Sequence, residues 1–138
     1  METTTKYIIR TLTTLLEAKG IKEAVLAPGS RNAPLSIAFN RQKGIRCHII
    51  VDERCAGYVA LGMAQKSNHA VAVVCTSGTA LLNLAPAVAE AYYQQIPLIV
   101  ISADRPAEWI DQDDSQTIRQ DGILNNIVKH SYQLPEED

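Results

Sequence analysis

The sequence lacks several features that mark common functional classes. Its 138 residues carry 13 Lys and Arg against 15 Asp and Glu, a formal charge of −2, so the basic excess of a nucleic-acid-binding protein is missing. The longest apolar run, near residues 96–101, is too short to cross a bilayer, and residues 1–5 do not resemble an export signal. These absences predict a cytoplasmic protein with no nucleic-acid partner and no membrane span.

The sequence also lacks arrangements typical of metal sites, disulfides and simple nucleotide folds. Cys47, Cys55 and Cys75 form no C-x-x-C pair, which argues against both a disulfide framework and a zinc cluster. The three histidines show no i, i+4 pairing, so we expect no metal site in this chain. G-x-G-x-x-G, P-loop and G-x-S-x-G motifs are absent, which weakens the dinucleotide, P-loop and hydrolase interpretations.

What is present predicts one α/β domain. The chain is 46% hydrophobic and 20% charged, enough for a single core. Apolar residues recur at helical spacing over residues 4–19, and Gly20 is a typical helix stop. Four Val- and Ile-rich runs, each continuously apolar as strands buried on both faces should be, alternate with three helical stretches. The strands are expected at 24–27, 48–51, 71–75 and 98–101, and the helices at 33–42, 53–66 and 80–94.

The alternation predicts an open, mostly parallel sheet with helices on both faces. The unusual residues follow directly after the four strands, at 28–32, 52–54, 76–79 and 104–106. In such sheets ligands bind beyond the carboxyl ends of the strands. Taken singly, these loops are ordinary turns and their charges ordinary surface residues. Together, Arg31, Arg105 and Glu53 at one edge suit an anionic substrate and a proton-transfer step.

Five segments in this order resemble a known family. They read APGSRNAPL at 27–35, DER at 52–54, TSGTALLN at 76–83, ADRP at 103–106 and QTIRQ at 116–120. Their order and spacing resemble the start of the 2-succinyl-5-enolpyruvyl-6-hydroxy-3-cyclohexene-1-carboxylate synthases of menaquinone biosynthesis, which use thiamine diphosphate. The resemblance covers nearly the whole chain. The acidic residue after the second strand and the T-S-G stretch are similar to thiamine-diphosphate enzymes generally, whereas P-G-S-R and A-D-R-P indicate this synthase.

The resemblance implies a thiamine-diphosphate-binding fold in its pyrimidine-domain form. Glu53 matches the glutamate that hydrogen-bonds the aminopyrimidine ring and promotes the imino tautomer, whose nitrogen then removes a proton from the thiazolium carbon. The pocket around that ring would be shaped by Pro28, Ser77, Gly78 and Asn83. Isochorismate or the reaction intermediate would be bound by Ser30, Arg31, Arg105 and Gln116.

The resemblance also implies parts of the enzyme that lie elsewhere. The family decarboxylates 2-oxoglutarate on thiamine diphosphate and adds the product to isochorismate. A Mg²⁺ ion anchors the diphosphate at a G-D-G motif, which this sequence lacks. We therefore expect residues 1–138 to be a single pyrimidine-binding domain, the amino-terminal fragment of a longer enzyme with central and diphosphate-binding domains. The fragment alone should be inactive, because family active sites form between subunits of a homodimer or tetramer.

One segment departs from the family pattern, and two other functions stay open. The family often has small residues and an asparagine before the glutamine that matches Gln116, whereas this chain has Asp113-Asp114-Ser115. We expect the two extra carboxylates to point to solvent. The alternatives are another thiamine-diphosphate-dependent oxoacid decarboxylase or synthase, and a non-catalytic anion-binding α/β module. Replacement of Glu53 by glutamine separates the module from the enzymes, because only an enzyme needs that carboxyl group.

Overall fold

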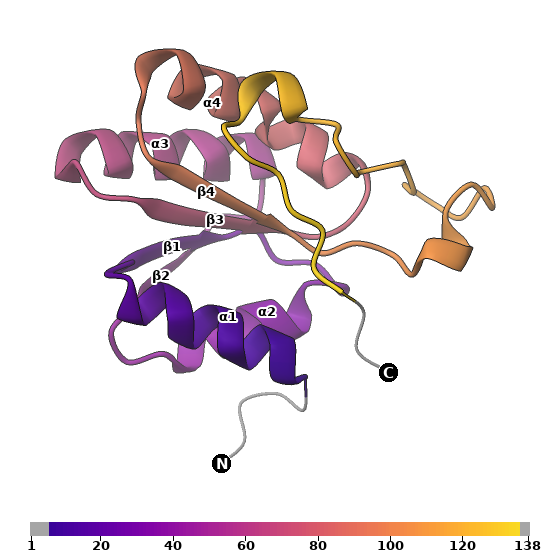
Figure 1. The fold of residues 1–138 in the computed structure, drawn as a ribbon, viewed down its shortest axis with the longest axis horizontal. Coiled ribbons are helices and arrows are strands. Elements are labelled where there is room, and N and C mark those ends of the chain that lie inside the picture. The colour runs from indigo at the N-terminus through magenta and orange to yellow at the C-terminus, as the bar shows by residue number, and fades with distance from the viewer. Residues whose placement is uncertain (1–5, 136–138) are drawn as a thin grey trace.

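Four strands form one parallel sheet in the order β2-β1-β3-β4 in the computed structural model, which describes residues 6–135. Helices α1 and α2 cover one face of this sheet, and α3 and α4 cover the other (Figure 1). The predicted α/β fold, with a parallel sheet and helices on both faces, is confirmed. The strands are β1 (Glu23–Leu26), β2 (Arg46–Ile49), β3 (Val71–Cys75) and β4 (Leu98–Ser102). The helices are α1 (Tyr7–Ala18), α2 (Ala33–Arg41), α3 (Glu53–Ser67) and α4 (Thr79–Gln94).

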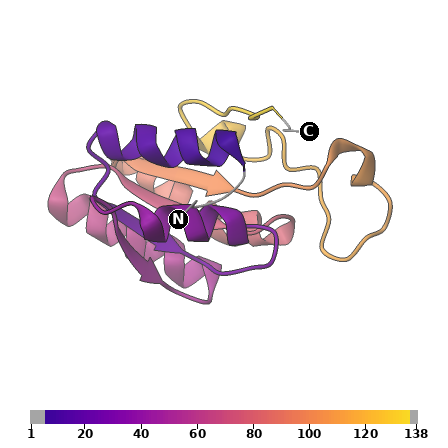
Figure 2. The same cartoon turned by 90° about the horizontal axis from the view of Figure 1, so that it is seen from below.

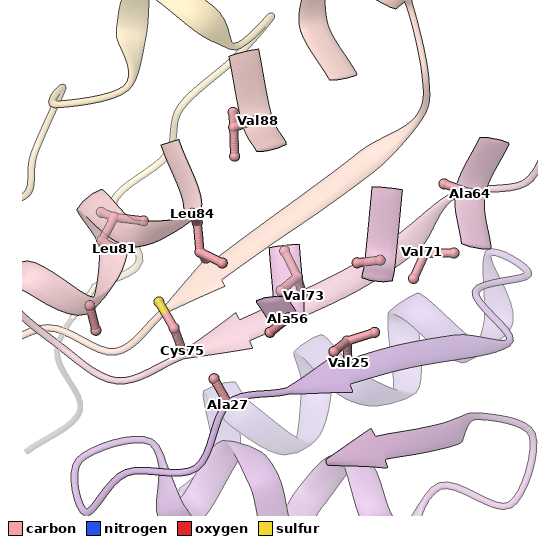
Figure 3. Close-up of a cluster of buried hydrophobic side chains, with 12 residues drawn as sticks. Val25, Ala27, Ala56, Ala64, Val71, Val73, Cys75, Leu81, Leu84 and Val88 are labelled. Carbon is pink, nitrogen blue, oxygen red and sulfur yellow. The ribbon is translucent and has the colours of Figure 1, made fainter. Parts of the chain in front are cut away.

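The two central strands supply side chains to both layers of the core, because successive residues of a strand point to opposite faces. Val25 and Val73 point toward α3 and α4, where they pack with Leu84 and other side chains of these helices (Figure 3). Leu26 and Val74 point the opposite way and pack with residues of α1 and α2, including the fully buried Phe39. The continuous apolar runs of β1 and β3 thus reflect burial on both faces, as predicted.

The two outer strands differ from their prediction, and the residues of β4 are only partly buried at one edge of the sheet. The apolar run at 48–51 was expected to be buried on both faces, but β2 spans Arg46–Ile49 and lies at the edge of the sheet. It pairs only with β1, and Ile49 is 56% exposed. The apolar run extends past the strand, so that Val51 lies in the following loop and is exposed. At the amino terminus, residues 4 and 5 of the predicted first helix lie outside the described residues.

All four strands end at the same side of the sheet, called here the carboxyl edge. Strand order reverses between β1 and β3, the position where open α/β sheets bind ligands. The loops after these two strands touch, since a Cβ built on Gly29 would lie 2.5 Å from the Cβ of Thr76. Two short 3₁₀ helices, η1 (Ala107–Trp109) and η2 (Asn125–Ile127), follow β4.

The chain after β4 extends away from the sheet before it returns. The segment that contains η1 projects beyond the carboxyl edge (Figure 2). The later residues Leu124, Ile127 and Val128 pack against the core beside α4. None of the helices within residues 6–135 combines the length and apolar character that a membrane span requires.

Candidate functional site

The turn after β3 is held by a segment that comes about forty residues later. The side-chain amide of Gln116 donates a hydrogen bond to the carbonyl oxygen of Ser77 at 2.7 Å, and the Gln116 carbonyl accepts from the Thr79 N–H at 3.1 Å. Gly78 adopts a φ of +80°, and a Cβ at this position would collide with the Gln116 carbonyl oxygen. The turn therefore requires glycine for two reasons, its left-handed backbone and the close approach of Gln116.

A second glutamine joins this turn to the end of β4. Gln120 is 6% exposed. Its side-chain oxygen accepts a hydrogen bond from the Gly78 N–H. Its Nε2 donates to the Ser102 Oγ at 3.2 Å and to the Ala103 carbonyl at 3.0 Å. Gln120 ends the QTIRQ segment, and the resemblance implies no role for it. No local pattern indicates its burial, because the contacts span distant parts of the chain.

The Arg105 guanidinium lies buried against this turn. Its Nη1 donates to the Ser77 Oγ at 2.7 Å, and its Nε lies 3.2 Å from an Asp114 carboxylate oxygen. The expectation that both carboxylates at 113 and 114 point to solvent is thus wrong for Asp114, which forms an ion pair with Arg105. Asp113 is exposed, as expected. A buried cation needs a paired anion, so Asp114 pairs with Arg105 although its own side chain stays 53% exposed.

The second predicted arginine, Arg31, contacts the segment that projects after β4. The guanidinium carbon of Arg31 lies 5.3 Å from the centre of the Trp109 ring, a cation–π contact with the projecting segment. Burial raises the pKa of the Asp104 carboxyl above its ordinary value, while the Arg105 N–H and the positive charges of Arg105 and Arg31 act in the opposite direction. The Asp104 carboxylate therefore interacts electrostatically with both guanidinium groups. Pro28 and Ser30 are exposed in the neighbouring loop.

Glu53 is the first residue of α3, at the carboxyl edge. The preceding Asp52 caps the helix by accepting a hydrogen bond from the Cys55 N–H at 2.8 Å. Glu53 is half-buried, and within residues 6–135 no hydrogen bond or ion pair engages its carboxylate. Burial, together with the negative charge of Glu53, raises the pKa of the Cys75 thiol to about 12. The carboxylate therefore lies near the end of β3.

The structure brings some predicted residues together and places others separately. Arg105 and Gln116 both hydrogen-bond Ser77, and Gly78 follows in the same turn. Asn83 lies one turn into α4, is exposed, and donates from its side chain to the Thr79 carbonyl at 3.3 Å. Within the part of the chain that the structure describes, no group of three or more His, Cys, Asp or Glu side chains is placed to hold a metal ion.

Asn32, a residue of the APGSRNAPL segment, fixes the first loop. It is fully buried, and its side-chain amide donates to the Ala27 carbonyl at 2.8 Å. The bond closes the loop that carries Ser30 and Arg31 over the end of β1. An asparagine between a strand and a helix is a common capping residue, so its sequence position alone did not indicate this interaction.

The sequence of the chain is similar to that of one group of enzymes. The family described as "Thiamine pyrophosphate enzyme, N-terminal TPP binding domain" matches residues 3–123. The 2-succinyl-5-enolpyruvyl-6-hydroxy-3-cyclohexene-1-carboxylate synthase of Bacteroides thetaiotaomicron is 58% identical over 131 residues, 95% of this chain and 24% of that protein. The synthase of Porphyromonas gingivalis is 55% identical over 129 residues, 94% of this chain and 22% of that protein.

A third synthase, from Desulfotalea psychrophila, is 60% identical over 120 residues, 87% of this chain and 22% of that protein. The chain thus spans about a quarter of the length of the relatives it matches. The resemblance drawn from the five sequence segments is confirmed. Because the family match covers most of its residues, the chain belongs to the thiamine pyrophosphate enzymes and carries their N-terminal TPP binding domain.

Proposed function

We propose that this chain is the pyrimidine-binding domain of a longer 2-succinyl-5-enolpyruvyl-6-hydroxy-3-cyclohexene-1-carboxylate synthase, which joins 2-oxoglutarate to isochorismate in menaquinone biosynthesis. The observation that carries the proposal is the group at the carboxyl edge, where the buried Arg105 and the exposed Gln116 both hydrogen-bond the Ser77–Gly78 turn. Glu53, the first residue of α3, has no hydrogen-bond or ion-pair partner within residues 6–135. The similarity to three synthases supports the same reaction.

Glu53 would act on the cofactor's aminopyrimidine ring. Glu53 is the first residue of α3, where the Asp52 cap fixes the backbone. The helix dipole favours a negative charge at this position. From this position the carboxyl would share a proton with a ring nitrogen, a role worth roughly 10²- to 10⁴-fold in rate. When bound, thiamine diphosphate supplies the nucleophilic carbon that attacks the oxoacid and accommodates the electron pair left by carbon dioxide. Pro28, Ser77, Gly78 and Asn83 would bound the pyrimidine ring.

The two arginines would recognise carboxylates of the substrates. A planar guanidinium binds a carboxylate through two parallel hydrogen bonds, and burial strengthens that interaction. Arg105 is 8% exposed and already donates to Ser77, which fixes its plane. Arg31 contacts Trp109 in the segment after β4. Ser30 and Gln116 would add polar contacts to the isochorismate ring or to the intermediate formed from it.

The remaining parts of the active site would come from other domains. We propose that a carboxyl-terminal domain holds the diphosphate through Mg²⁺, and that the site forms between two subunits of a cytoplasmic homodimer or tetramer. The 138-residue chain alone should then show no turnover, because it supplies only the pyrimidine side of the site. Robust turnover by the isolated chain would contradict the proposal that other domains supply part of the active site.

The test uses the full-length protein with thiamine diphosphate and Mg²⁺. It is offered 2-oxoglutarate or pyruvate in separate reactions, each with isochorismate, and the loss of each oxoacid is followed. The proposal predicts consumption of 2-oxoglutarate and negligible consumption of pyruvate. The opposite preference would indicate a different thiamine-diphosphate-dependent decarboxylase or synthase.

A further inference from the structure

Asp114 forms an ion pair with Arg105, the arginine that we propose binds a substrate carboxylate. Its Oδ2 atom lies 3.2 Å from the Arg105 Nε, while the neighbouring Nη1 is held by the Ser77 hydroxyl at 2.7 Å. The aspartate carboxylate and a substrate carboxylate present the same pair of acceptor oxygens to a guanidinium. We propose that Asp114 is an internal competitor, which binds Arg105 in the empty site and lowers the affinity of the enzyme for its carboxylate substrate.

The burial of the two partners suits an exchange of this kind. The Arg105 side chain is 7% exposed, whereas the Asp114 side chain is 53% exposed. The cation is therefore fixed in the protein, and its carboxylate partner lies on the solvent side. Asp114 can leave without opening the core, since the exposed carboxylate is already partly hydrated. An entering carboxylate would then restore the charge pair that the buried guanidinium requires.

The local backbone also favours release. Asp113 and Ser115, the two neighbours of Asp114, adopt φ values of 54° and 53°. This left-handed conformation costs free energy for residues other than glycine, although aspartate tolerates it better than most. Asp111 has a φ of 64° as well and is held by Arg119 at 2.6 Å. While Asp114 is paired with Arg105, the residues on either side of it therefore hold backbone conformations that they do not prefer.

The inference deepens the proposed function, because it takes Arg105 as the residue that receives a substrate carboxylate. A site that is available for only part of the time shows an apparent affinity reduced by that fraction. For a partly exposed ion pair, the occupied state should exceed the open state by roughly two- to fivefold. Removal of the Asp114 charge should therefore tighten substrate binding by a similar factor.

The experiment compares the full-length wild type with Asp114→Asn and with Asp113→Asn, which removes an equal charge one residue away. Binding of isochorismate is measured by calorimetry without turnover, and KM for isochorismate is measured with thiamine diphosphate and Mg²⁺. We expect Asp114→Asn to lower both the dissociation constant and KM for isochorismate by roughly two- to fivefold. Asp113→Asn should leave both constants near the wild-type values.

The direction of the change decides between two roles. If Asp114 orients Arg105 for the substrate, Asp114→Asn will bind isochorismate more weakly, and the proposal is overturned. Equal effects of the two substitutions will overturn it as well, since they indicate a general charge effect. Arg105→Lys serves as a separate arm, which should raise KM if Arg105 binds substrate. A wild type that binds isochorismate but does not turn it over contradicts the proposed function. In that case the calorimetric comparison of the variants still tests whether Asp114 competes with isochorismate.

Discussion

The buried side chain of Gln120 accepts a hydrogen bond from the backbone N–H of Gly78, 42 residues earlier in the chain. Through its Nε2, the same side chain donates to Ser102 and Ala103 at the end of β4. One glutamine thus fixes the turn after β3 relative to the loop that carries Arg105. The geometry of the candidate site depends on a residue that does not itself belong to any of the four loops after the strands.

Replacement of Gln120 by alanine should destabilise the protein by about 1–3 kcal/mol, because it leaves the buried Gly78 N–H and Ala103 carbonyl without their partner. The matched control is Gln112→Ala, which removes a glutamine whose side chain bonds the Glu108 carbonyl at an exposed position. The control should change the free energy of unfolding by less than about 0.5 kcal/mol. Urea unfolding measures both. Similar losses in the two variants would show that Gln120 has no special role.

Two glycines should respond to alanine in opposite directions. Gly78→Ala places a Cβ against the Gln116 carbonyl at a φ of +80°, so we expect a loss of at least about 1–2 kcal/mol in stability. Gly62 lies within α3, and a Cβ there would meet no atom within 4 Å. Gly62→Ala should therefore stabilise the protein by roughly 0.5–1 kcal/mol. A Gly78→Ala protein as stable as the wild type would exclude the close approach described here.

The buried thiol of Cys75 predicts a specific alkaline pH dependence. Burial, aided by the charge of Glu53, raises the pKa of this thiol from 9.0 to about 12. The unfolded chain loses the thiol proton near pH 9, whereas the folded protein retains it. The associated stability is therefore complete below about pH 9 and is lost as the pH rises toward 12.

Cys75→Ala provides the comparison, since it removes the titrating group. Between about pH 9 and pH 11, the free energy of unfolding of the wild type should fall more steeply than that of the variant, by up to roughly 1.4 kcal/mol per pH unit. Urea unfolding at a series of pH values gives both slopes. Parallel slopes would mean that the Cys75 thiol ionises as readily in the folded state as in the unfolded state.

The sequence predicted the order of the helices and strands because each element carries its own local pattern. The continuous apolar runs of β1 and β3 indicated central strands correctly, whereas the similar run near β2 belongs to an edge strand and continues into a loop. Apolar composition records the preference of residues for burial. It does not specify how many neighbouring strands will be present.

The candidate site was predictable at its four loops and less so between them. Glu53 and Arg105 follow strand ends, so that the topology alone places them at the carboxyl edge. The contacts of Trp109 with Arg31 and of Asp114 with Arg105 arise from the irregular segment after β4. No periodic pattern determines the path of such a segment. Its position follows from a few specific interactions between residues that are distant in the sequence.

The most direct test of the central claim follows the loss of 2-oxoglutarate by the full-length protein with thiamine diphosphate and Mg²⁺, with and without isochorismate, in the wild type and in Glu53→Gln. We predict that the wild type forms the coupled product only when isochorismate is present. Glu53→Gln should lose roughly 10²- to 10⁴-fold of this rate, because an amide cannot exchange the required proton. A wild type that does not consume 2-oxoglutarate, or a Glu53→Gln variant with full activity, would contradict the account.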